Sequence, residues 1–198
     1  MVYDGILFAV IVGFIRKGNL KFLTEPLFRW GWIFPVILII QIFVFNFQNQ
    51  LPILGEWSNK IFIFVYIVGL FFLWLNRKHA GFNIIMIGVL LNFIVMAING
   101  GRMPVSEEAS TILDPMYMEA IKNGFYGKHA LLTESTKLAF LGDIIPITSP
   151  YPRDQVISIG DVIMNVGIFL FIQNKMLQDK PANEEMISTH ELKGGEIK

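Results

Sequence analysis

The stretch HAGFNIIMIGVLLNFIVMAINGG, residues 79–101, is mostly apolar and contains no Asp, Glu, Lys or Arg. The stretch WGWIFPVILIIQIFVFNFQNQLPILG, residues 30–55, has the same character. A helix that crosses a bilayer needs about 20 mostly apolar residues, so each stretch can span a membrane. Residues 5–15 and 61–76 are also uncharged. They are shorter, and they reach spanning length only together with their flanks.

The composition of the whole chain also favours a membrane protein. Of its 198 residues, 54% are hydrophobic and 16% are charged, whereas soluble domains have about 25% charged residues. Sixteen basic residues balance sixteen acidic ones, and they form no basic stripe, so no nucleic-acid partner is expected. The chain has no cysteine, which excludes disulfides and thiolate metal sites. These features predict an all-α fold, namely a polytopic helical membrane protein with the lipid bilayer as its partner.

Charged residues at the ends of the apolar stretches indicate an orientation. Basic residues follow the first, third and fifth predicted helices, whereas the segments after the second and fourth have no basic excess. Because basic residues mark the cytoplasmic side, we expect the N-terminus outside and the C-terminus in the cytoplasm. The polar residues 178–198 are predicted to form a disordered cytoplasmic tail. The membrane domain, residues 1–177, is predicted to contain about five transmembrane helices, at about residues 2–16, 30–50, 60–76, 80–98 and 157–175.

The long segment 99–156 lies outside the cell in this arrangement and is predicted to cover the outer end of the helices. Asp114 followed by Pro115 is typical of a helix start. We therefore expect a short helix there, ending at Gly124. A second short helix is expected over residues 134–141, ahead of Gly142.

Three groups of polar residues are expected to meet at the outer end. They are Asn99, Gly100, Gly101 and Arg102 after the fourth helix, Asp143 in the outer segment, and Asp161 with Asn165 at the start of the fifth helix. A charge inside a bilayer costs about 2.5–3.5 kcal/mol, so Asp161 needs a partner. Arg102 is the candidate partner.

Three interpretations of this group stay open. Asp143 and Asp161 can form a catalytic pair of carboxylates, in which repulsion keeps one of them protonated. Alternatively, Arg102, the amides of the Asn-Gly-Gly turn and the amide side chain of Asn165 can bind an anionic ligand. In the third interpretation, which we favour, Arg102 pairs with an aspartate and pins the outer segment to the helices.

The three histidines, His79, His129 and His190, are far apart in the sequence. Their spacing is not that of a metal site, and we expect all three at the surface. The sequence predicts no bound metal and no cofactor.

Three sequence motifs are similar to those of a known family. They are NGGRMPV at 99–105, LGDIIP at 141–146 and SIGDVIMNVG at 158–167. They resemble those of a bacterial family of small integral membrane proteins classified as a domain of unknown function. That resemblance implies the bacterial cytoplasmic (inner) membrane and supplies no activity. More weakly, the placing of Asp143 and Asp161 is similar to that in lipoprotein signal peptidase, which implies that both aspartates are catalytic.

The sequence therefore predicts an uncharacterised multi-span membrane protein with an Asn/Arg/Asp site at its outer face. The expected role is structural, or that of an accessory or scaffold protein in a complex with other membrane proteins. An aspartate-dependent intramembrane hydrolase is the alternative. Transport of a small solute or lipid is third, because one polar site at the outer end gives no path across the bilayer. Whether the protein is an enzyme is left open.

Overall fold

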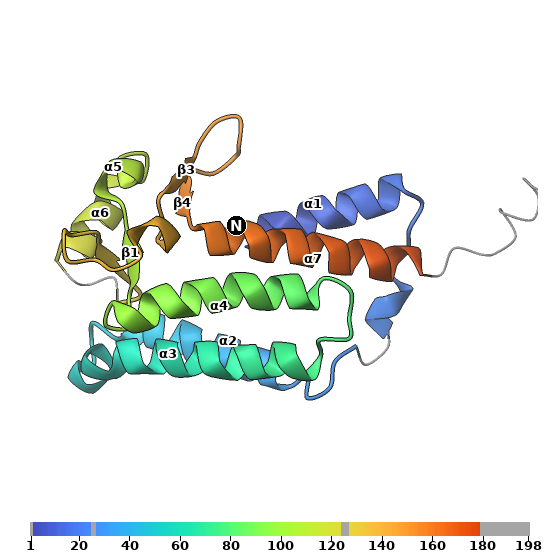
Figure 1. Ribbon diagram of the computed structural model, residues 1–198, viewed down its shortest axis with the longest axis horizontal. Helices are drawn as coiled ribbons and strands as arrows, with labels where there is room; N and C mark the ends of the chain where they lie inside the picture. Colours follow the sequence, from blue (N-terminus) through green and yellow to red (C-terminus); the bar gives the residue numbers. More distant parts are fainter. Residues whose placement is uncertain (1, 25–26, 124–126, 179–198) are drawn as a thin grey trace, which may run out of the picture.

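The computed structural model describes residues 2–24, 27–123 and 127–178. This part of the chain is mostly helical, and five long helices lie side by side in Figure 1. α7 packs against α1 and α4, α4 packs against α3, and α3 packs against α2. The helices are α1 (Val2–Ile15), α2 (Ile33–Phe47), α3 (Pro52–Leu75), α4 (Phe82–Ile98) and α7 (Ile159–Leu177), with the single turn η1 (Lys21–Thr24) after α1.

Each of these helices overlaps one predicted span, but the ends differ, because α3 begins before residue 60 and α7 ends after residue 175. α2 begins at Ile33, because Trp30 has a φ of +58° and lies in a turn. α3 begins at Pro52, whose missing N–H costs nothing in a first helical turn. Of the described helices, α3 alone is long and apolar enough to cross a bilayer; α2, α4 and residues 5–15 are apolar but shorter. The crossing of all five helices therefore stays a proposal.

Glycines allow α4 and α7 to approach closely. A Cβ atom on Gly88 would meet the Gly160 carbonyl oxygen and would lie 2.7 Å from the Met164 backbone nitrogen. A Cβ atom on Gly167 would lie 2.6 Å from the backbone nitrogen of Ile85. These close contacts hold the first half of α7 against the first half of α4.

Residues 99–123 and 127–158 form a cap at one end of the helices (Figure 1). β1 pairs with β2 in parallel, and β3 pairs with β4 in antiparallel orientation. The prediction of an all-α fold is wrong for this cap, because strands of three residues are too short to show a period in the sequence. Its elements are β1 (Met103–Val105), α5 (Glu107–Ser110), α6 (Pro115–Lys122), β2 (His129–Leu131), η2 (Ala139–Leu141), β3 (Ile145–Ile147) and β4 (Gln155–Ile157).

The first short helix predicted in the cap is present, and the second is not. Asp114 caps α6, since its carboxylate accepts a hydrogen bond from the Met116 backbone N–H at 2.8 Å. The predicted end at Gly124 lies outside the described residues. Over 134–141 only the turn η2 forms. Leu138 there has a φ of +50°, and the Thr136 hydroxyl competes for the backbone by accepting from the Thr133 N–H at 2.9 Å.

His79, predicted at the surface, closes the opposite end of the bundle instead. Its ring packs against Phe28, Phe82 and Phe171, with centroids 5.3–5.9 Å apart. Burial, and to a smaller extent the charge of Lys175, lowers the pKa of His79 below its usual 6.5. His190 and the predicted tail beyond residue 178 lie outside the described residues.

Candidate functional site

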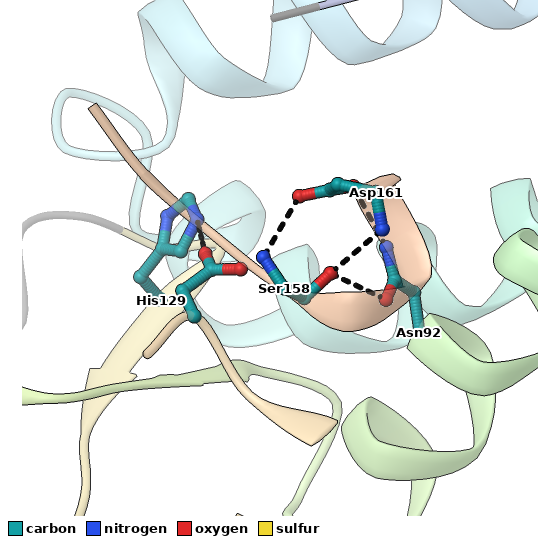
Figure 2. A network of polar contacts seen from close by, with 5 residues as sticks. Asn92, His129, Ser158 and Asp161 are labelled. Atoms are coloured by element: carbon teal, nitrogen blue, oxygen red, sulfur yellow. Dashed lines mark hydrogen bonds and ion pairs between the residues drawn. The ribbon is translucent and has the colours of Figure 1, made fainter. Parts of the chain in front are cut away.

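Asp161 lies in the first turn of α7, where α4 holds its carboxylate (Figure 2). Asn92 Nδ2 donates to Asp161 Oδ1 at 2.9 Å, and the Ser158 backbone N–H donates to Oδ2 at 3.3 Å. Ser158 Oγ donates to Asn92 Oδ1 at 2.8 Å and accepts from the Asp161 N–H at 3.0 Å. Asn92 and Ser158 are both buried. Both oxygens of Asp161 are therefore engaged in one closed network.

Ser158 is the N-cap of α7 and forms a capping box with Asp161. This role was not predicted, although Ser-x-x-Asp ahead of an apolar run is its signal in the sequence. The predicted ion pair between Arg102 and an aspartate is wrong. Arg102 makes no ion pair or hydrogen bond with Asp143 or Asp161 in the structure, because neutral donors already satisfy Asp161.

Asp143 follows η2 in the cap and is 6% exposed. Its Oδ2 lies 3.3 Å from His129 Nε2. No hydrogen bond to Asp143 Oδ1 exists among the described residues. Its backbone N–H donates to the Pro104 carbonyl at 2.8 Å, which ties it to β1. Since β2 pairs with β1, His129 reaches Asp143, and the prediction of a surface position for His129 is wrong.

The two aspartates lie at the same end of the bundle but belong to different networks. Asp143 is close enough to interact electrostatically with Asp161. Tyr66 of α3 lies beside Asn92, and Lys128 of the cap interacts electrostatically with both Asp161 and Tyr66. A catalytic pair of aspartates shares one proton between adjacent carboxylates. Here the partners of Asp161 are Asn92 and Ser158, which favours a structural role for it.

The Asn-Gly-Gly turn holds the cap on α4. Asn99 Nδ2 donates to the Lys137 carbonyl at 2.8 Å, and its Oδ1 accepts from the Lys137 N–H at 3.0 Å. Gly100 and Gly101 have φ values of +75° and +83°, the left-handed conformation that ends a helix. The Gly101 N–H donates back to the Met96 carbonyl at 2.8 Å. Of these predicted binding residues, Asn99 therefore attaches the cap through two hydrogen bonds to the Lys137 backbone, which we call the clamp. Gly100 and Gly101 form the turn that ends α4.

The remaining predicted residues, Arg102 and Asn165, are not brought together. Arg102 lines a cavity of about 340 Å³ that Thr133 and Thr136 also line. Asn165 Nδ2 donates to the Asp161 backbone carbonyl at 2.8 Å. Its side chain fills the space beside Gly5, where a Cβ atom would clash with it. Asn165 therefore contributes to the packing of α1 on α7.

Comparison with known proteins places the chain among relatives without an assigned activity. The model of DUF5317, described as a family of unknown function, matches residues 26–173. A Thermotoga maritima protein described as uncharacterized is 31% identical over 171 residues, which cover 86% of this chain and 89% of that protein. No solved structure matches the chain. The matched residues include the cap and both aspartate networks.

Proposed function

This chain belongs to the family of unknown function DUF5317, and we propose that it is a polytopic protein of the bacterial cytoplasmic membrane with a structural or accessory role. In this proposal α1, α2, α3, α4 and α7 all cross the bilayer. The N-terminus and the cap lie outside, and the chain after α7 lies in the cytoplasm. Its partners are lipid and other proteins of a membrane complex.

The observation that carries this proposal is the apolar surface of the long helices. Large hydrophobic side chains on them are exposed, including Phe8 at 62%, Phe34 at 63%, Ile39 at 64% and Phe64 at 60%. Soluble monomers rarely expose contiguous apolar patches larger than a few hundred Å². A lipid environment removes this cost, because acyl chains are as apolar as these side chains.

Aromatic and basic side chains at both ends of α3 support the crossing. Lys60 Nζ lies 4.1 Å from the centre of the Trp57 ring, and the Arg77 guanidinium lies 4.6 Å from that of Trp74. Tryptophan prefers the membrane–water interface, where long basic side chains can reach the headgroups. The two pairs therefore suit the two surfaces of a bilayer.

The Asp161 network supports a structural role of the polar site. A charged group in a helix bundle is tolerated when it is paired with neighbouring helices. Asp161 is paired in this way with Asn92, and through Ser158 it fixes the point where the cap enters α7. The clamp of Asn99 on Lys137 fixes the other connection of the cap, at the end of α4.

An aspartate-dependent hydrolase is the second candidate, and one observation favours it. Asp143 is buried, and its Oδ1 has no hydrogen-bond partner among the described residues. Cleavage of a lipid-modified signal peptide by the purified chain, lost in both Asp143→Asn and Asp161→Asn, would establish the hydrolase. If the chain does not cleave and Asp161→Asn alone lowers the amount of protein in the membrane, the structural role holds.

Single cysteines test the topology without background, since the chain has no cysteine of its own. Thr111 in the cap and Lys78 between α3 and α4 are both exposed. In intact cells, a membrane-impermeant maleimide should label Thr111→Cys. It should label Lys78→Cys only after the membrane is opened. Equal labelling of both variants in intact cells, or recovery of the protein in the soluble fraction, would contradict the topology.

Photo-crosslinking tests the accessory role. A photoreactive residue in place of Phe64, on the exposed face of α3, should give one defined adduct with another membrane protein in native membranes. The same residue in place of the buried Phe62 is the matched control and should give none. Adducts with lipid alone at position 64 would contradict an accessory role.

A further inference from the structure

The cap contains a cavity of about 330 Å³ beside the His129–Asp143 pair. This volume lies at the small end of the range of about 300–1,000 Å³ in which proteins bind small molecules. Asp143, His129, Arg153 and Gln155 line its polar side. All residues that line this cavity belong to the cap, so ligand binding there does not depend on how many helices cross the membrane.

Two buried polar atoms of residues that line this cavity lack a partner. Asp143 Oδ1, an acceptor, and Gln155 Nε2, a donor, make no hydrogen bond with any described residue. Buried polar groups are nearly always hydrogen-bonded, and leaving one unpaired is costly. A ligand that satisfies both residues must itself bring a donor and an acceptor.

The charged residues that line the cavity further restrict the kind of ligand that fits it. The lining offers the carboxylates of Asp143 and Asp154 and the guanidinium of Arg153. A lone carboxylic acid would face two acids, and a lone amine would leave the buried Gln155 Nε2 without an acceptor, whereas Arg153 is exposed to solvent. A group with a positive and a negative or carbonyl end fits both kinds of residue.

Apart from Tyr117, the rest of the lining is apolar. Val105, Leu113, Ile121 and Val156 line the cavity, and Val105 and Ile121 are among the most buried residues of the cap. Such a surface favours an aliphatic group over a polar one, because burial of apolar area is favourable. The ligand therefore combines an aliphatic part with adjacent donor and acceptor groups.

We propose that this cavity binds an α-aminoacyl group with an aliphatic side chain, either as a free amino acid or as the first residue of a peptide. The ammonium group donates to Asp143, which His129 holds in place. The carbonyl or carboxylate accepts from Gln155 Nε2, and a free carboxylate also pairs with Arg153. The side chain packs against Leu113 and Ile121.

A ligand series tests the chemistry by calorimetry on the full chain in detergent micelles. L-leucine, leucinamide and a leucyl tripeptide carry both groups, whereas leucinol lacks the carbonyl and 4-methylpentanoate lacks the amine. We expect each truncated analogue to bind about tenfold or more weakly than leucinamide. Binding of leucine but not of the tripeptide identifies a free amino acid, and the reverse identifies a peptide end. Absence of binding, or equal binding of 4-methylpentanoate and leucine, overturns the proposal.

Variants test the residues. Arg153→Gln should weaken leucine about tenfold and leave leucinamide unchanged, because only leucine carries a carboxylate. Arg102→Gln, the same substitution at the other cavity, is the matched control and should change neither. Asp143→Asn should abolish binding; if it does not fold, Leu113→Trp, which fills the cavity, takes its place. Undiminished binding of leucinamide to Asp143→Asn or to Leu113→Trp also overturns the proposal.

Discussion

Asn92 joins α4 to the start of α7 with both ends of its amide group. Its Nδ2 donates to the Asp161 carboxylate, and its Oδ1 accepts from the Ser158 hydroxyl. Gln carries the same amide donor and acceptor, but its side chain is longer by one methylene group. From the sequence, the cost of a buried charge predicts that Asp161 has a partner. The sequence does not show that this partner is neutral, because only the packing of α4 on α7 decides which side chains meet.

Asn92→Ala should lower the free energy of unfolding by about 2–4 kcal/mol, because it removes a hydrogen bond to a charged group and leaves the buried Ser158 hydroxyl without its acceptor. Chemical unfolding in detergent micelles measures this. Asn83→Ala on the same helix is the matched control, since it makes the same substitution at an exposed position. Equal losses in the two variants would show that the network contributes nothing.

The long helices are the elements that the sequence predicts best. Charge-free stretches that are long enough to span a bilayer contain α2 and α4, and shorter ones contain most of α1 and α3. The cap is predicted poorly, because its strands have three residues each and are held by pairing partners distant in the chain, such as Met103 and His129. The capped helix α6 is the exception, since Asp114 and Pro115 signal its start locally.

The contact between α4 and α7 is an element-scale feature that the sequence conceals. Glycines spaced seven residues apart, at 81 and 88 and at 160 and 167, face one another across the two helices. Neither pair forms a GxxxG motif, and for this reason the sequence gives no sign of the contact. The close approach brings Asn92 within reach of Ser158 and Asp161, so the site depends on these glycines.

Gly88→Ala should destabilise the protein by about 1–3 kcal/mol, the usual cost of overpacking, because its Cβ would meet the backbone of α7. Gly69→Ala on α3 provides the control. Nothing lies within 4 Å of a Cβ at that position, so it should be neutral or gain up to about 1 kcal/mol from helix propensity. Thermal unfolding of both variants in detergent decides the matter. A Gly88 variant as stable as the Gly69 variant would contradict the packing of α4 on α7.

At the scale of the whole molecule, charged residues are few on the long helices and frequent in the cap. The long helices keep their few charged groups near their ends, and the cap carries five basic and seven acidic residues between 99 and 156. The beginning of α1 lies at the capped end in Figure 1. This arrangement agrees with an N-terminus and cap on one side of a bilayer. The sequence predicts this side from basic residues, whereas the cavity in the cap, which joins residues from α6, β2 and β4, is formed only by the fold.

The dimensions of the bundle lead to a prediction about the membrane it prefers. Trp57 and Trp74 on α3 are 17 positions apart, which at about 1.5 Å per residue is about 26 Å. α2, with 15 residues, is about 23 Å long. Both lengths are shorter than the hydrocarbon core of about 30 Å in a typical bilayer. A membrane that is too thick leaves polar ends in hydrocarbon, at a cost of a fraction of a kcal/mol per Å.

We therefore expect the protein to be more stable in vesicles of fluid, monounsaturated phosphatidylcholine with acyl chains of about 16 carbons than with chains of about 22 carbons. Thermal unfolding of the reconstituted protein, followed by tryptophan fluorescence, measures this, since Trp57 and Trp74 lie at the two expected interfaces. Unsaturated chains keep every bilayer fluid, so thickness is the variable that changes. Because the mismatch acts on every crossing helix, the effect should exceed that expected for α3 alone. An unfolding temperature that rises with chain length would show that the five helices do not cross the bilayer as a bundle of this height.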